Sequence, residues 1–129
     1  HVEQWGAPAT PADLLKRRTL KVGWQSTNAV WTLRQPDASE VALPFTPVLC
    51  SDDMSTLKQA AKDNLGIVAL PAYACKDELA AGQLVRILSD WTAGSAQLSL
   101  LTAGRTSLNA PARLLKDYLI SHLSEYVAV

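Results

Sequence analysis

The residues with the chemistry for catalysis are two cysteines and two histidines. Cys50 and Cys75 lack the CxxC spacing of a zinc or redox site, so we interpret them as two buried free thiols. A Cys/His nucleophile pair would require His122 to meet one of these thiols, since His1 begins the chain. Nothing in the spacing favours that meeting. We therefore expect no catalytic residue, and a small thiol-dependent α/β enzyme remains the weakest alternative.

Acids and glycines that could bind a metal or a phosphate are also too sparse for a site. Asp52 and Asp53 are adjacent, and neighbouring positions on a helix point in different directions, so they are interpreted as acids at a helix start. Gly66 and Gly82 stand alone, without a GxGxxG or GxxxxGK[ST] pattern. The sequence therefore predicts no metal site and no cofactor.

Tryptophans are more informative. Trp24 and Trp31 flank a polar loop at residues 26–28, which could form an aromatic and hydroxyl-lined ligand mouth. The alternative is that these two tryptophans belong to the core or to an interface. Trp5 and Trp91 are interpreted as packing residues.

Composition excludes several functional classes. Twelve Lys and Arg balance twelve Asp and Glu, which argues against nucleic-acid binding by bulk charge. The 129 residues are 48% hydrophobic and 19% charged, as in an ordinary compact domain. Apolar runs such as residues 67–70 are far shorter than the roughly 20 residues of a membrane-spanning helix. Because the chain begins with His1 and its one methionine is Met54, we expect a processed chain or part of a longer one.

Helices and strands alternate along the first half of the chain. Thr10, Pro11 and Asp13 signal a short capped helix, and residues 51–53 open a second one that Asn64 ends in the left-handed conformation. Between them the pattern predicts strands at residues 19–25, 30–34, 40–43 and 46–50, with Pro44 at a break or on an edge strand.

The second half continues the alternation. Residues 67–70 are typical of a strand buried on both faces, and residues 72–81 of a short helix closed by glycine. Two further strands are predicted at residues 84–88 and 97–101. A final helix from residue 110 to about 126, capped by Asn109, has an apolar face that we expect to be buried; this face comprises Leu115, Tyr118, Leu119 and Leu123. The pattern indicates an α/β fold with a mixed sheet.

Taken in order, five stretches resemble the effector-binding domain of LysR-type transcriptional regulators. Residues 6–14 are similar to the family's G-x-P-x-x-P-x-D-L, residues 31–33 to its W-x-F strand, and residues 51–71 to l-x-x-A-a-x-x-G-l-G-I-a-x-L-P. Residues 79–91 resemble l-x-x-G-x-L-V-x-v-L-x-x-W, and the final helix, with matches between residues 107 and 119, resembles the C-terminal R-x-x-s-P-x-x-R-x-f-i-d-x-L. Asn64 stands where the family has its first glycine, and asparagine tolerates the same turn.

This resemblance implies a lobe of a type 2 periplasmic-binding-protein-like fold. Residues 1–106 would form the second lobe and residues 107–129 a helix that returns toward the first, with lobe I and the winged helix-turn-helix outside this chain. It also implies a cytoplasmic, bacterial, homo-oligomeric regulator that is not an enzyme, senses a small molecule, and touches DNA only through its N-terminal domain. A solute-binding receptor of the same fold is the main alternative.

The effector would lie in the cleft between the lobes, at strand ends and helix starts. Unpaired backbone N–H groups at these positions can donate hydrogen bonds to anionic or polar groups of a ligand. The candidate effector-binding residues are Gly23, Trp24, Gln25, Ser26, Ser51, Asp52, Leu70 and Pro71.

Overall fold

The computed structural model describes residues 6–24, 28–94, 98–102 and 108–127. The chain divides into two compact units, residues 1–95 and residues 96–129. The label η marks a 3-10 helix. Within the first unit the elements follow one another in the order η1 (Pro11–Lys16), β1 (Thr19–Val22), β2 (Ala29–Arg34), β3 (Glu40–Phe45), β4 (Leu49–Ser51), α2 (Met54–Lys62), β5 (Ile67–Val68), η2 (Ala72–Cys75), α3 (Lys76–Ala80) and β6 (Thr92–Ala93). In the second unit the described helix is α4 (Ala110–Val127).

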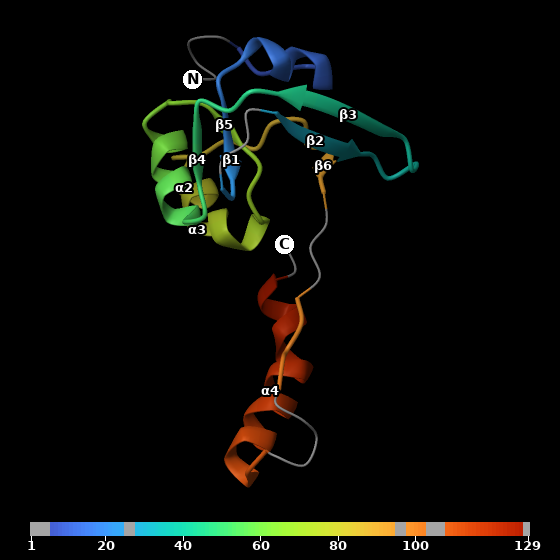
Figure 1. Ribbon diagram of the computed structural model, residues 1–129, viewed down its shortest axis with the longest axis vertical. Coiled ribbons are helices and arrows are strands. Elements are labelled where there is room, and N and C mark those ends of the chain that lie inside the picture. Colours follow the sequence, from blue (N-terminus) through green and yellow to red (C-terminus); the bar gives the residue numbers. More distant parts are fainter. Residues whose placement is uncertain (1–5, 25–27, 95–97, 103–107, 128–129) are drawn as a thin grey trace. The chain divides into compact units, whose positions relative to one another are not determined.

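A parallel sheet in the order β4-β1-β5 positions the candidate site. Leu20 of β1 pairs with Leu49 of β4 on one side and with Val68 of β5 on the other. Helix α2 connects β4 to β5 and packs against all three strands (Figure 1). Leu20 and Leu57 are both 0% exposed, so this layer has its own buried apolar contacts.

An antiparallel sheet in the order β3-β2-β6 is the second sheet of the first unit. Strands β2 and β3 make a hairpin, visible in Figure 1, whose turn holds Ala38 at φ 67°. Leu33 and Leu43 from the hairpin pack with Leu14 of η1 in the main apolar cluster. The predicted α/β class is confirmed, with parallel and antiparallel pairs separated into two sheets.

Helix boundaries agree with the capping signals. Asp13 accepts hydrogen bonds from the Thr10 backbone N–H at 3.1 Å and from the Thr10 hydroxyl at 2.9 Å, and η1 begins at Pro11. Both bonds lower the pKa of Asp13, and the bond from the Thr10 hydroxyl has the larger effect. At the end of α2, Asn64 is left-handed at φ 61°, so the predicted turn is present.

Several predicted strands are wrong or shorter. Residues 84–88 and the described residues 98–101 form no strand, and residue 97 lies outside the described residues. Ile87 and Leu88 lie in irregular chain and pack on the apolar cluster instead. Their side chains are partly buried in this way without any strand pairing. In place of a strand at 84–88, the short β6 follows at Thr92–Ala93.

Proline and burial signals also need correction. Of the two predictions for Pro44, the break is wrong and the edge strand is confirmed: Pro44 pairs with Val30 inside β3, the outer strand of its sheet, where a missing N–H costs no ladder bond. The run at 67–70 contributes only Ile67–Val68 to a strand, and β5 is half-buried at a sheet edge rather than central. Two other strands are shorter than predicted: β1 ends at Val22 rather than at residue 25, and β4 begins at Leu49 rather than at residue 46.

Helix α4 confirms the predicted cap but not the predicted burial. The Asn109 Oδ1 atom accepts a hydrogen bond from the Ala112 N–H at 3.0 Å. Leu115, Tyr118 and Leu123 are 59%, 52% and 39% exposed, and α4 has no buried residue in the part of the chain that is described. The period of a helix predicts an apolar stripe but does not supply the surface that covers it. Among the described residues, no helix is long and apolar enough to cross a membrane.

Candidate ligand-binding edge of the parallel sheet

Five candidate residues meet at one edge of the parallel sheet. Because β1, β4 and β5 run in the same direction, their carboxyl ends share that edge. The Gly23 N–H donates a hydrogen bond to the Ser51 carbonyl at 2.8 Å. The ladder of β5 with β1 ends where Val68 pairs with Leu20, so Leu70 and Pro71 follow the carboxyl end of β5. Three neighbouring strand ends therefore carry five of the candidates: Ser51 is the last residue of β4, and Gly23, Asp52, Leu70 and Pro71 come after strand ends.

The chain leaves β1 through a conformation that favours glycine. Gly23 has φ 108°, and nothing lies within 4 Å of the position of a Cβ atom, so backbone shape, not crowding, selects glycine there. Trp24, which follows, is 82% exposed. Trp31, by contrast, is half-buried against the apolar cluster. The two tryptophans therefore differ: Trp31 packs against the apolar cluster, as the core alternative predicted, whereas Trp24 is exposed to solvent beside the edge.

Gln25 and Ser26 lie outside the described residues, as does Trp5.

The start of α2 differs from the open anion site expected there. The Asp53 carboxylate accepts hydrogen bonds from the Ser55 N–H at 3.1 Å, the Thr56 N–H at 2.9 Å and the Thr56 hydroxyl. The hydroxyl bond is the main reason that the pKa of Asp53 is lowered. An anionic ligand group would have to displace this carboxylate. The expectation that these first-turn N–H groups are open to a ligand is wrong.

Neighbouring groups at this edge are polar. The Ser51 hydroxyl accepts a hydrogen bond from the Asp53 N–H at 3.1 Å, which ties the end of β4 to the start of α2. Asp52 is exposed on the same connection. The edge thus presents hydroxyl, carboxylate and indole groups, which suit noncovalent recognition of a polar ligand.

A lysine that the sequence interpretation overlooked fixes the segment after Pro71. The Lys58 ammonium lies 2.7 Å from Glu78 Oε1 and donates to the Ala74 carbonyl at 3.0 Å. The two side chains are 26% and 15% exposed. The hydrogen bond lowers the pKa of Glu78 and raises that of Lys58. Lys58 thereby anchors η2 and α3 to α2, a link between positions too distant in sequence for a local pattern to reveal.

The thiols and imidazole do not assemble a site in the described chain. Cys75 is 8% exposed, and burial raises the pKa of its thiol, which keeps it protonated. Cys50 is half-buried, and both cysteines are free. His122 stacks on Tyr118 within α4. The part of the chain that is described holds no group of three His, Cys, Asp or Glu residues able to bind a metal.

The class of protein follows from comparison with known families. The family model described as LysR substrate binding domain matches residues 1–124, and the chain belongs to this family. Its α/β fold is that of LysR-type regulatory domains, a type 2 periplasmic-binding-protein-like fold.

Individual proteins and solved structures are also similar to this chain. The chain is 30% identical over 122 residues to the probable HTH-type transcriptional regulator LtrA of Klebsiella pneumoniae, covering 92% of this chain and 39% of LtrA. The regulatory domain of AphB from Vibrio vulnificus, treated with cumene hydroperoxide, has a TM-score of 0.71 at 27% identity, covering 93% of this chain and 59% of that one. The full-length Vibrio cholerae virulence activator AphB matches in fold, with a TM-score of 0.62 at 22% identity over 72% of this chain and 31% of that one. The chain therefore spans less than two thirds of the length of each of these relatives.

Proposed function

We propose that this chain is the ligand-sensing part of a LysR-type transcriptional regulator. Residues 1–106 form lobe II and residues 107–129 a helix that returns toward lobe I, while DNA is bound by a separate N-terminal domain. The meeting of three strand ends at one edge carries the proposal, because ligands of open α/β sheets bind outside the carboxyl ends of the strands. The family match over residues 1–124 supports it.

The effector is a small molecule bound between the lobes. In this lobe it contacts the eight candidates: Gly23, Trp24, Gln25, Ser26, Ser51, Asp52, Leu70 and Pro71. An effector that binds both lobes stabilises one angle between them, and this shift repositions the DNA-binding domains of an oligomer. The regulator acts in the cytoplasm and senses its ligand without converting it.

A test uses the whole regulator. We would screen small metabolites by thermal shift and then repeat each hit on Trp24→Ala and Ser51→Ala. The expected result is loss of the ligand-induced shift in both variants. Ser39→Ala, in the β2–β3 turn, is the matched control and should keep the shift. Hits that remain unchanged in both edge variants would remove the edge from the binding site.

The 129-residue chain alone should bind the same effector weakly or undetectably. Half of the polar partners and half of the wall that excludes water would be missing. Calorimetry with the identified effector checks this expectation. Micromolar or tighter binding to the isolated chain would contradict the two-lobe arrangement.

A further inference from the structure

The strand end at Leu70 and Pro71 needs an anchor beyond the sheet. The ladder of β5 with β1 comprises the two residues of β5, so Leu70 and Pro71 leave the sheet before η2 begins. Ser51, by contrast, is itself part of β4 and pairs with Val22 of β1. Contacts outside the sheet must therefore fix the position of the third strand end of the candidate edge.

A chain of polar contacts connects Pro71 to the middle of α2. The Ala74 N–H donates a hydrogen bond to the Pro71 carbonyl at 3.0 Å. The Ala74 carbonyl accepts a hydrogen bond from the Lys58 ammonium, also at 3.0 Å, and this ammonium lies 2.7 Å from Glu78 Oε1. Lys58 thus contacts the turn that follows Pro71 and, at the same time, α3.

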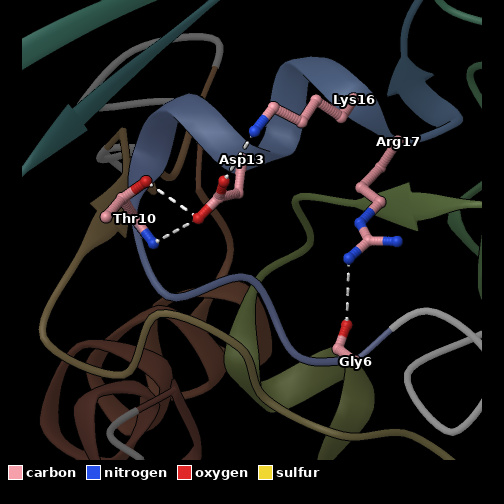
Figure 2. A network of polar contacts seen from close by, with 5 residues as sticks. All are labelled: Gly6, Thr10, Asp13, Lys16 and Arg17. Atoms are coloured by element: carbon pink, nitrogen blue, oxygen red, sulfur yellow. Dashed lines mark hydrogen bonds and ion pairs between the residues drawn. The ribbon is translucent and has the colours of Figure 1, made fainter.

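Figure 2 shows an ion pair of a different kind. Lys16 and Asp13 lie three residues apart in η1, with 3.3 Å between Nζ and Oδ1, and their side chains are 78% and 31% exposed. Lys58 and Glu78 come from different helices and are 26% and 15% exposed. An exposed pair contributes little because water solvates both charges, whereas a pair withdrawn from water is costly to break from one side. The Lys58–Glu78 pair therefore constrains tertiary structure, which an exposed pair within one helix does not.

The backbone on both sides of this pair is held by apolar burial as well. Leu57, which precedes Lys58, is 0% exposed, and Cys75, which follows Ala74, is 8% exposed. Burial of these side chains stabilises α2 and η2 without help from the ion pair. Removing the ammonium should therefore leave the first unit folded, and the effect should appear at the turn that the ammonium contacts.

We propose that the Lys58–Glu78 pair is a positioning device for the effector edge: it fixes the strand end at Leu70 and Pro71 through Ala74, and thereby sets how tightly this end of the edge holds a ligand. The inference rests on the proposed function of the edge. Lys58 and Glu78 act through the backbone of Ala74, so they are positioning residues. Supporting contacts of this kind improve affinity, because a segment that is already held in place loses less conformational freedom on binding.

The first test measures amide hydrogen exchange in the 129-residue chain. Lys58→Met keeps a long apolar stem and removes the ammonium. We expect exchange of the Ala74 N–H to become about tenfold faster, because its turn opens more often once the Ala74 carbonyl has lost a charged donor. The Ile67 N–H, which donates to the Arg18 carbonyl at 2.8 Å, is the internal reference and should exchange at the wild-type rate.

Matched variants separate this pair from charge in general. Lys58→Arg should restore most of the protection at Ala74, because a guanidinium can also donate to two acceptors. Lys16→Met removes the exposed pair of Figure 2 and should leave exchange at Ala74 unchanged. Glu78→Gln keeps the shape of the side chain and should speed exchange at Ala74 by a smaller factor, and it decides the matter if Lys58→Met does not fold.

The second test measures ligand affinity in the whole regulator by calorimetry. Its probe is the metabolite with the largest thermal shift in the screen of that regulator. Lys58→Met should raise the Kd for this metabolite about tenfold. Lys58→Arg should restore part of the affinity, and Lys16→Met should leave the Kd unchanged.

Equal acceleration at Ala74 and Ile67 would overturn the proposal, because the pair would then stabilise the whole unit. Unchanged exchange at Ala74, or a wild-type Kd in Lys58→Met, would also overturn it. A screen without hits would count against the proposed function, while exchange at Ala74 would still decide whether the pair fixes the strand end. The proposed function and the positioning role can therefore fail separately.

Discussion

The two units of the chain differ in where their apolar side chains lie. In residues 1–95 the large aliphatic residues of the core are buried, among them Leu14, Leu20, Leu33, Leu43 and Leu57. In residues 96–129 the corresponding residues of α4 are exposed, with Leu114 at 72% and Ile120 at 67%. Burial of apolar side chains dominates folding stability, whereas caps and backbone bonds define a helix without stabilising it strongly alone. The comparison indicates that stability resides in the first unit.

Tryptophan fluorescence can report on that unit separately. All four tryptophans, Trp5, Trp24, Trp31 and Trp91, lie within residues 1–95. Urea unfolding followed by their emission therefore measures the first unit directly.

The largest expected effect is that of Leu57→Ala. Leu57 belongs to α2 and is 0% exposed, so its truncation should lower the free energy of unfolding by about 2–5 kcal/mol. Ser55→Ala, at an exposed position of the same helix, is the control and should change it by less than about 0.5 kcal/mol. An unchanged urea midpoint for Leu57→Ala would show that α2 does not cover the sheet.

Gly66→Ala should have the next largest effect. A Cβ atom at Gly66 would lie 2.6 Å from the Arg18 carbonyl oxygen, and Ile67 donates a hydrogen bond to the same oxygen at 2.8 Å. Separating these segments should cost about 1–3 kcal/mol and disturb the pairing of β5 with β1. Gly82→Asn is the contrast, because Gly82 has open space and a φ of 67° that asparagine tolerates. Equal losses in both variants would contradict the crowding argument.

Acid should weaken the first unit through Asp53. The pKa of Asp53 is lowered in the folded chain, first by the Thr56 hydroxyl. Its contribution is therefore complete above the unfolded pKa of about 3.9 and is lost as the pH falls through the lower folded value.

The Asp53→Asn variant tests this linkage. Asparagine still caps a helix, so the variant should match the wild type near neutral pH and lose less stability in acid. Asp52→Asn should retain the wild-type acid dependence, since Asp53 accepts the first-turn bonds. Parallel pH curves for the wild type and Asp53→Asn would refute the assignment.

The smallest effects are expected in α4. Leu114→Ala and Leu115→Ala, at positions 72% and 59% exposed, should change the unfolding measured by tryptophan by less than about 0.5 kcal/mol. A loss approaching that of Leu57→Ala would mean that the second unit stabilises the first.

Local signals predicted much of the fold. The Thr10 and Asp13 cap, the start of α2, the left-handed Asn64 and the Asn109 cap all depend on groups within a few residues of one another. Strand assignments failed where packing decided. Ile87 and Leu88 have strand-like composition, yet they pack as irregular chain. Residues 40–43 were expected to end before Pro44, but β3 continues through this proline because the strand lies at an edge of its sheet.

The candidate site divides in the same way. Its members could be selected from strand ends and helix starts, but their grouping depends on the parallel register of β4, β1 and β5. Whether the first-turn backbone N–H groups of α2 are open to a ligand could not be predicted from the pattern. An aspartate at position 53 is compatible with an open anion site and equally with a helix that its own side chain caps. Lys58 was missed because its partner Glu78 is distant in sequence.

By itself, the sequence determined the family, the capped helix ends, and the alternation of strands and helices up to α2, because caps, turns and periodicity act over a few residues. The tertiary structure alone decided that Trp24 is exposed while Trp31 packs, that three strand ends share one edge, and that Leu14 of η1 packs with Leu33 and Leu43 of the hairpin. These features depend on contacts between distant segments, whose geometry arises only when the chain is packed.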